Sequence, residues 1–163
     1  MTTNTFDNVT KPPRNVITFS AQASWRGEGV GVDVTARGHR LSADEPAELG
    51  GRDIGPNPVE LVLAGLGSCL TVLAALFAPK HGVDLQAFAV DVEGDLDPAG
   101  FQELADVRPG FLRIRYRIRV GSPSPRDRVE ALLEHIQRVC PVKDTLTGVP
   151  IEYGGAEHVP TAA

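Results

Sequence analysis

The chain has 163 residues, 42% of them apolar and 23% charged, which is an ordinary composition for a soluble globular protein long enough to bury a core. Its formal net charge of -5 argues against non-specific nucleic-acid binding by the chain as a whole. We expect no membrane segment, because we interpret none of the apolar runs as reaching the roughly 18 residues that a membrane span needs.

The N-terminal segment is polar. Residues 1–14 contain Pro12-Pro13 and are predicted to form a flexible arm. They lack a basic stretch followed by an apolar one, so we expect no secretory signal and a cytoplasmic location. In that reducing compartment a disulfide is transient more often than structural.

Strands are predicted after this arm. Residues 15–44 are rich in Val, Thr and Gly and contain short alternations such as Val30–Val34, which indicates two or three antiparallel strands. Residues 45–56 carry two prolines and three glycines and are predicted to form a loop.

The next segment has clear signals for a helix. Asn57 can cap it, Pro58 suits its first turn, and Glu60 stands three residues after the cap, as in a capping box. The run stays apolar to about Ala78 and Pro79 follows, which predicts a helix buried on nearly every side. Within it, the poor helix formers are expected to let other backbone approach closely beside Cys69; these are Gly65, Gly67 and Ser68.

Two further strands are predicted. Residues 83–97 alternate like a half-buried strand, and residues 98–110 are expected to form a loop. Residues 112–120 alternate throughout, with apolar side chains on one face and arginines on the other, at Arg113, Arg115, Arg117 and Arg119. This arginine stripe could bind nucleic acid or an acidic partner, but the acidic net charge favours the solvated face of a sheet.

The C-terminal part alternates helix and strand. A second helix is predicted from Ser124-Pro125, with Asp127 three residues after the Ser cap, and it ends at Cys140-Pro141. A short helix can begin at Pro141, Val149–Tyr153 is expected to form a closing strand, and residues 154–163 to form a loose tail. This order of elements predicts an α+β protein.

The two cysteines carry the strongest indication of function. Cys69 lies inside the apolar helix and Cys140 closes the amphipathic one, so they suggest a pair that meets in the fold and does redox chemistry. Each could instead be a small buried hydrophobe. A permanent disulfide is a third reading, and closing a loop of about 70 residues would be worth on the order of 4 kcal/mol.

The positions of the thiols differ. Cys69 lies twelve residues past the helix start, too far for the helix dipole, so its activation would need a nearby cation and hydrogen bonds. If Pro141 opens a helical turn, Cys140 occupies its cap, where backbone N–H groups favour a thiolate. The two cysteines and the histidines show no metal-ligand spacing; His39, His81, His135 and His158 are interpreted as surface residues.

Two motifs around these cysteines resemble the OsmC/Ohr family of osmotically inducible and organic hydroperoxide resistance proteins. The match comprises Gly55–Cys69 and Val139–Val142 with the strand that follows, and in order it extends over roughly residues 15–153. Shorter likenesses to OsmC-related branches lie at Asp44–Pro46, Leu49–Gly51 and Glu93–Asp97.

The resemblance implies an intertwined homodimer with antiparallel sheets around two buried central helices, and a single domain over residues 15–153. It also implies thiol-dependent reduction of organic hydroperoxides without metal, flavin or other cofactor. Cys69 would be the peroxidatic thiol and Cys140 the resolving thiol, which would form a disulfide. An external dithiol, such as a lipoyl protein or thioredoxin, would then reduce this disulfide.

The family site also uses an arginine and a carboxylate beside the reactive thiol. Arg26 is our choice for the arginine, with Arg40 and Arg52 as alternatives. In the hydroperoxide branch the acid directly follows Asn-Pro, where this chain has Val59, and Glu60 comes one residue later. Because one helical residue is a rotation of about 100°, Glu60 is either catalytic or only a helix-capping residue.

This departure leaves a second function open, a non-catalytic protein that binds a small apolar ligand on the same scaffold. A third reading is a nucleic-acid-associated factor that uses the arginine strand.

Overall fold

The computed structural model describes residues 15–160, so the predicted N-terminal arm lies outside the described residues. The chain forms two units that divide after Asn57. Both contain a sheet, and the helices longer than five residues are in the second, so the predicted α+β class is confirmed.

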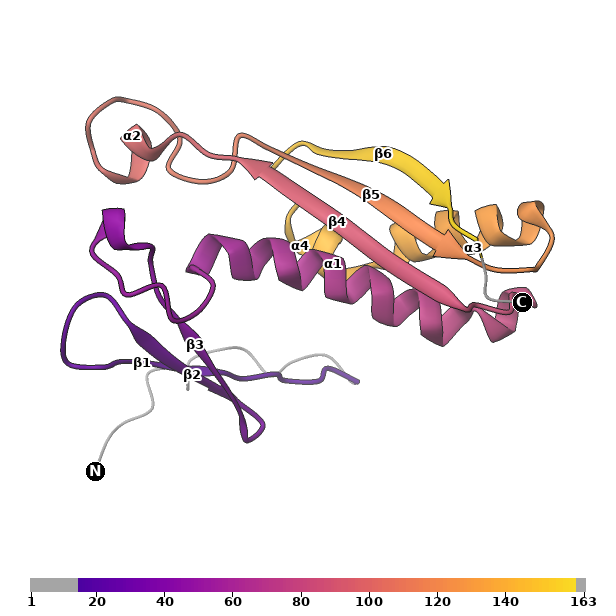
Figure 1. The fold of residues 1–163 in the computed structure, drawn as a ribbon, viewed down its shortest axis with the longest axis horizontal. Coiled ribbons are helices and arrows are strands. Elements are labelled where there is room, and N and C mark those ends of the chain that lie inside the picture. Colours follow the sequence, from indigo (N-terminus) through magenta and orange to yellow (C-terminus); the bar gives the residue numbers. More distant parts are fainter. Residues whose placement is uncertain (1–14, 161–163) are drawn as a thin grey trace. The chain divides into compact units, whose positions relative to one another are not determined.

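The first unit is built on a three-stranded antiparallel sheet (Figure 1). Its strands β1 (Gln22–Trp25), β2 (Val32–Ala36) and β3 (His39–Ala43) confirm the prediction for residues 15–44. Arg37 and Gly38 connect β2 to β3 with φ angles of 52° and 85°. Two consecutive positive φ values are typical of the tight hairpin turn whose twist matches that of the strands.

The loop after β3 is anchored by a buried carboxylate. Asp44 is 3% exposed and accepts hydrogen bonds of 2.9 Å from the backbone N–H groups of Glu45 and Arg52. The bond from Arg52 is the largest of the effects that lower the pKa of Asp44. The loop also contains a short 3-10 helix, η1 (Ala47–Leu49).

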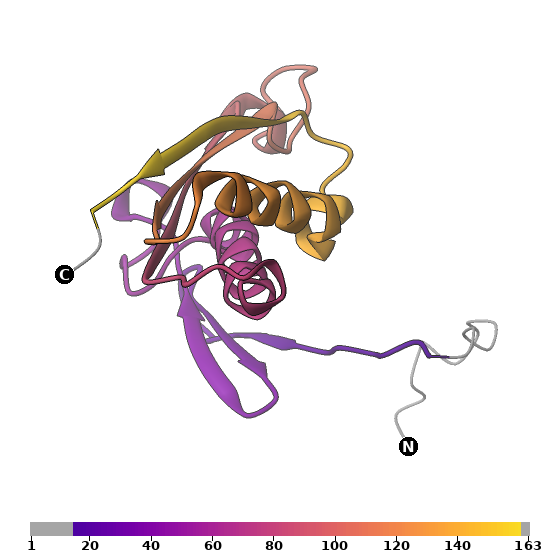
Figure 2. The same cartoon turned by 90° about the vertical axis from the view of Figure 1, so that its right-hand side faces the viewer.

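The second unit is a three-stranded sheet with helices on one face (Figures 1 and 2). The sheet order is β4 (Ala87–Asp95), β5 (Arg113–Gly121), β6 (Ile151–His158). Helices α1 (Pro58–Phe77) and α3 (Arg126–Val139) cover the inner face. The shorter helices are η2 (Pro79–His81), α2 (Pro98–Phe101) and α4 (Pro141–Thr145).

This second sheet is mixed, not purely antiparallel as predicted. β4 pairs with β5 antiparallel, but β6 pairs with β5 in parallel. The reason is the connection, since the chain passes through α3 and α4 between β5 and β6 and returns in the same direction.

β6 is also longer than predicted. The expected strand end at Tyr153 and the loose tail after Gly154 are wrong, because β6 continues to His158. The register against β5 shifts between Tyr116 and Ile118, and Gly155 has a φ of 95°. Gly154-Gly155 therefore forms a bulge inside the strand, where the pattern suggested an end.

Helix α1 has the predicted bounds but only one buried face. Leu66, Leu70 and Ala74 are fully buried, whereas Val72 and Leu76 are 64% and 65% exposed. The prediction of burial on nearly every side is therefore wrong for this chain alone. By length and composition α1 could also cross a membrane, contrary to our reading of the apolar runs. One face of α1 nevertheless packs into the core, through Leu66, Leu70 and Ala74.

Close approach beside Cys69 is confirmed at one of the glycines. A Cβ at Gly67 would lie 3.3 Å from Val92 Cγ2 and 3.6 Å from the Val90 carbonyl oxygen of β4. No neighbour lies within 4 Å of a Cβ built at Gly65. Of these two glycines of α1, only Gly67 therefore lies in close contact with β4.

Two predicted helix signals differ from the structure. No side chain caps α3, whose cap residue is Pro125. The Ser124 hydroxyl instead accepts a 2.8 Å bond from the Asp84 N–H. The predicted loop at 98–110 begins with α2, because the Asp97 carboxylate accepts a 2.9 Å bond from the Ala99 N–H.

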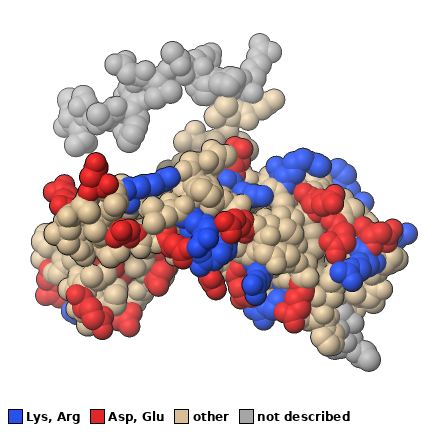
Figure 3. Space-filling view, turned by 90° about the horizontal axis from the view of Figure 1, so that it is seen from above, with Lys and Arg blue, Asp and Glu red and all other residues tan. Residues whose placement is uncertain are grey.

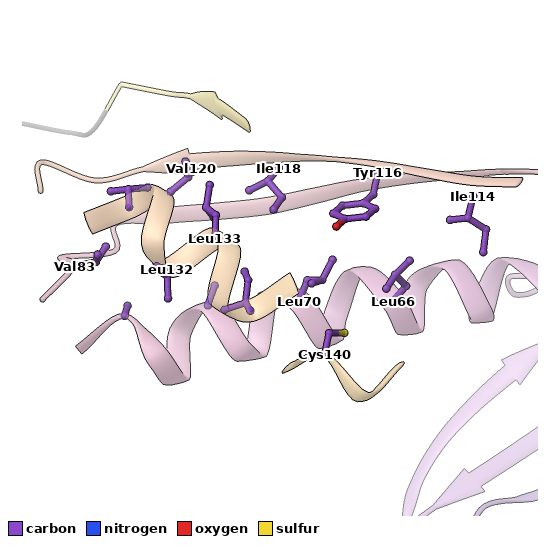
Figure 4. Close-up of a cluster of buried hydrophobic side chains, with 14 of the residues drawn as sticks. Leu66, Leu70, Val83, Ile114, Tyr116, Ile118, Val120, Leu132, Leu133 and Cys140 are labelled. Carbon is purple, nitrogen blue, oxygen red and sulfur yellow. The ribbon is translucent and has the colours of Figure 1, made fainter. Parts of the chain in front are cut away.

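The core of the second unit lies between the helices and the inner face of the sheet (Figure 4). Leu66 and Leu70 point from α1 toward Ile114 and Tyr116 of β5. The alternation in β5 is confirmed for Ile114, Tyr116, Ile118 and Val120, all at most 1% exposed. Cys140 belongs to the same cluster.

The outer face of this sheet is charged. The carboxylates of β4 lie opposite the arginines of β5, and the ion pairs are Asp91–Arg119, Glu93–Arg115, Asp95–Arg113 and Asp95–Arg115. Figure 3, seen from above, shows basic and acidic side chains intermixed. Three of the four arginines of the stripe are thus matched by acids on the neighbouring strand.

Candidate functional site

The fold brings the two cysteines together. Cys69 lies in the middle of α1, and Cys140 lies between α3 and α4. The Cys69 side chain lies close enough to the Cys140 thiol to raise the pKa of that thiol. No disulfide joins the two thiols in this structure.

The local sequence around Cys140 fixes its position. Pro141 cannot continue α3, so the chain turns at Cys140 and Pro141 starts α4. Cys140 is the cap residue of α4, as predicted, and its Sγ accepts a 3.4 Å bond from the Lys143 N–H.

Burial dominates the ionisation of Cys140. The thiol is 1% exposed, and this burial is the main reason that its pKa is raised. The Lys143 N–H works in the opposite direction, and the Cys69 side chain adds to the increase. Cys140 therefore stays protonated under conditions in which an ordinary thiol begins to ionise, which makes it a weak competitor for an oxidant.

Cys69 is the more accessible thiol. Its side chain is half-buried and packs against the apolar core cluster. A thiol that combines partial access with an apolar surround can receive a small molecule that has an apolar tail.

A partly buried polar pair lies near Cys140. The Tyr116 hydroxyl donates a 2.7 Å hydrogen bond to Gln137 Oε1 of α3. Burial raises the pKa of Tyr116 to about 12, with smaller contributions from Tyr153 and Cys140. Sequence patterning placed Tyr116 on the inner face of its strand but gave no signal for this contact.

Arg26 is held within the first unit. Its guanidinium donates to Asp33 from Nε at 3.0 Å and to Ser42 Oγ from Nη2 at 2.6 Å. Arg26 is part of the first unit and Cys69 part of the second, so their pairing stays a prediction. Of the alternatives, Arg52 donates a 3.0 Å bond to Glu28, and Arg40 lies on β3.

Glu60 lies in the exposed first turn of α1. Glu60 precedes Cys69 by nine positions in the same helix. That spacing is about 900° of rotation and about 13 Å of rise, which directs the two side chains to opposite sides of α1. Within one chain, Glu60 is therefore not brought to the reactive thiol.

The structure pairs two of the four histidines, which the sequence pattern did not indicate. His81 Nε2 and His135 Nδ1 lie 2.8 Å apart. The Phe77 ring stands 4.4 Å from the His135 ring, measured between centroids. The two histidines are 54 residues apart in the chain, so no local spacing could have revealed them.

No group of three His, Cys, Asp or Glu side chains arranged to hold a metal ion occurs in residues 15–160.

Solved structures of the same fold include three with informative names. An OsmC-like protein from Mycoplasma pneumoniae has a TM-score of 0.74 at 18% identity, covering 90% of this chain and 99% of the other. An organic hydroperoxide resistance protein OsmC, a predicted redox protein from Legionella pneumophila, has a TM-score of 0.61 at 23% identity, covering 87% and 98%.

A third structure is an organic hydroperoxide resistance protein from Elizabethkingia anophelis, with a TM-score of 0.63 at 19% identity, covering 93% of this chain and 100% of the other. No curated protein is similar enough to this chain to count as a match. The family model described as OsmC-like protein matches residues 50–154, which include both cysteines. With its fold and its paired thiols, the chain belongs to the OsmC family.

Proposed function

We propose that this protein is a thiol-dependent peroxidase that reduces organic hydroperoxides in oxidative-stress defence, with Cys69 as the peroxidatic thiol and Cys140 as the resolving thiol. The observation that carries the proposal is the proximity of Cys69 to the Cys140 thiol, whose pKa it raises, in a chain of this family. The names of two structural relatives, both organic hydroperoxide resistance proteins, point the same way.

The proposed reaction needs only these two sulfurs and the peroxide. The Cys69 thiolate attacks the distal peroxide oxygen and the O–O bond breaks. The alkoxide that leaves takes a proton from solvent and is released as the alcohol. Cys69 is then a sulfenic acid. The Cys140 thiol attacks its sulfur, water leaves, and the Cys69–Cys140 disulfide forms. An external dithiol reduces this disulfide by exchange.

The environments of the thiols fit these roles. The raised pKa of Cys140 keeps that thiol protonated. Cys69 therefore reacts with the peroxide first, and Cys140 reacts afterwards with the sulfenic acid. The apolar side chains packed around Cys69 suit an alkyl hydroperoxide, because each buried CH₂ of its tail is worth about 0.8 kcal/mol.

Turnover with an alkyl hydroperoxide and a dithiol tests the proposal directly. We expect wild-type protein to consume the peroxide, Cys69→Ser to lose turnover, and Cys140→Ser to react once without sustained turnover. Wild-type turnover no faster than that of Cys69→Ser would remove the proposal.

Arg26 is proposed as the cation beside Cys69 in the peroxidase site, with Arg40 and Arg52 as alternatives. Arg26→Met is expected to slow the reaction of Cys69 with peroxide, whereas Arg40→Met leaves it unchanged. Since Arg26 also binds Asp33 and Ser42, a thermal melt of each variant separates a loss of chemistry from a loss of structure.

A non-catalytic function has one observation in its favour, the position of Glu60. Glu60, the acid in the first turn of α1, lies about 900° of helical rotation from Cys69, which places the two on opposite sides of α1. A protein that holds a small apolar ligand would show that ligand by native mass spectrometry and would not turn over peroxide.

A further inference from the structure

A cavity lies against the thiol pair on the side of Cys140. A cavity of about 260 Å³ has walls from the end of α3, from α4, and from the segment that leads into β6. Cys140 forms part of its wall. The remaining lining residues belong to these same elements and not to α1, which carries Cys69.

The cavity has the chemical character of a site for a small thiolate. Arg138 and Lys143 supply positive charge, Asp144 supplies one negative charge, and Val149 and Ile151 supply apolar wall. Thr147 is exposed at the surface, whereas Cys140 is buried at 1% exposure. A slender molecule can therefore reach the cavity, but a cysteine fixed on the surface of a folded protein cannot easily approach that sulfur.

The geometry of disulfide exchange favours this side. An attacking thiolate approaches along the S–S axis, from behind the sulfur that it attacks. With the disulfide formed, the region behind Cys140 as seen from Cys69 lies away from α1. The cavity formed by α3, α4 and the start of β6 lies on a side that α1 does not line.

The chemistry of the leaving group agrees with the geometry. A thiol with a raised pKa is a poor leaving group, and burial raises the pKa of Cys140. Attack at Cys69 would have to expel Cys140. Attack at Cys140 expels Cys69 instead.

We propose that the reducing dithiol enters through the cavity beside Arg138, Lys143 and Thr147 and attacks Cys140, so that reductant and peroxide reach the thiol pair from different sides. This inference rests on the proposed function, since it concerns the disulfide that the peroxidase would form.

The exchange balances in two steps. A thiolate of the dithiol attacks Cys140 Sγ, the S–S bond breaks, and its electron pair leaves on Cys69, which becomes a thiolate. The second thiol of the reductant loses its proton and attacks the mixed disulfide, which releases Cys140 as a thiolate and closes the reductant into a cyclic disulfide. Two electrons pass to the protein, and the protons of the dithiol end on the cysteines or in solvent.

The test uses the full chain oxidised with diamide, so that it does not depend on peroxide turnover. Thr147→Trp narrows the opening, and Thr145→Trp is the matched control, an exposed threonine of α4 outside the cavity wall. Reduction by dihydrolipoamide is followed by rapid alkylation of the released thiols and mass spectrometry. Oxidation of each reduced variant by an alkyl hydroperoxide is measured in parallel.

We expect Thr147→Trp to slow reduction at least about tenfold while Thr145→Trp has little effect, because access limits thiol exchange. The peroxide step should stay within about twofold for both variants. Equal reduction rates for the two variants would overturn the proposal. If instead the peroxide step never yields a disulfide in wild-type protein, it is the proposed function that fails.

A second measurement locates the attacked sulfur. Diamide-oxidised protein is mixed with 2-mercaptoethanol, quenched with acid within the first part of the reaction, and digested. The mixed disulfide is expected on the peptide that contains Cys140. An adduct found mainly on the Cys69 peptide would contradict attack from the cavity.

Discussion

At the scale of single residues, the identities of the two thiols could be predicted from the sequence, but their surroundings could not. Cys69 and Cys140 stood out because each occupies a defined position, one inside an apolar helix and the other before Pro141. The contact of Tyr116 with Gln137 and that of His81 with His135 join elements distant in sequence. The periodicity of the sequence cannot predict such contacts, because each depends on how α3 packs against the other elements.

The histidine pair predicts a dependence of stability on pH. Burial, followed by the charges of His81, Arg138 and Lys80, lowers the pKa of His135 from its ordinary value of 6.5. The unfolded chain therefore binds the proton more readily than the folded chain. Stability is complete above about pH 6.5 and declines as the pH falls from there through the lower pKa of the folded protein.

Urea unfolding at several pH values checks this expectation. Between about pH 7.5 and pH 5, the midpoint of wild-type protein should fall further than that of His135→Gln, which has no imidazole to protonate at this position. His39→Gln, altered at an exposed residue of β3, serves as the control. An equal fall in wild-type protein and His135→Gln would show that the pair does not sense pH.

At the scale of elements, strands with strict alternation could be predicted and their partners could not. The alternation of β5 gave its buried face, but the parallel pairing with β6 depends on the crossover through α3 and α4. The glycines of β6 were read as a strand end, because a bulge and a break have the same local composition. Similarly, α2 was hidden in a loop that contains glycine and proline.

The close packing around Gly94 of β4 predicts that a larger residue there destabilises the protein. A Cβ at Gly94 would lie 2.5 Å from Phe111 Cε1 and 3.2 Å from Leu63 Cδ2. Phe111 is 8% exposed and cannot move aside freely. Gly94→Ala is therefore expected to lower the free energy of unfolding by about 1–3 kcal/mol, as overpacking does.

Chemical denaturation measures this change, with Gly38→Ala as a contrasting variant. Gly38 has open space around a built Cβ but a φ of 85°, so its cost would come from backbone strain and not from a clash. If Gly94→Ala is as stable as wild-type protein, Phe111 is not held as tightly as the packing indicates.

At the scale of the whole molecule, the exposed apolar side chains call for a partner surface. One face of α1 is open at Val72 and Leu76, and Trp25 and Phe19 of the first unit are 66% and 82% exposed. Where exposed apolar side chains form a contiguous patch, the patch commonly marks an interaction surface. We propose that a second copy of this chain covers them, forming the homodimer that the resemblance implies.

Sedimentation equilibrium tests this homodimer. Wild-type protein is expected at twice the chain mass, and Val72→Lys is expected to shift toward the monomer, because it places a charge on the open face of α1. Lys80→Glu, which changes an already exposed charged residue after α1, is the control. A wild-type monomer at micromolar concentration would contradict the proposal.

Whether Cys69 and Cys140 act as one redox couple is tested most directly by a single turnover with an alkyl hydroperoxide. Fully reduced protein is mixed with one equivalent of an alkyl hydroperoxide, quenched, alkylated and digested, and the cysteine peptides are identified by mass spectrometry. The account predicts one linked pair, the Cys69 peptide joined to the Cys140 peptide by a disulfide. Recovery of both peptides as alkylated free thiols, or oxidation of Cys140 in the Cys69→Ser variant at the wild-type rate, would contradict it.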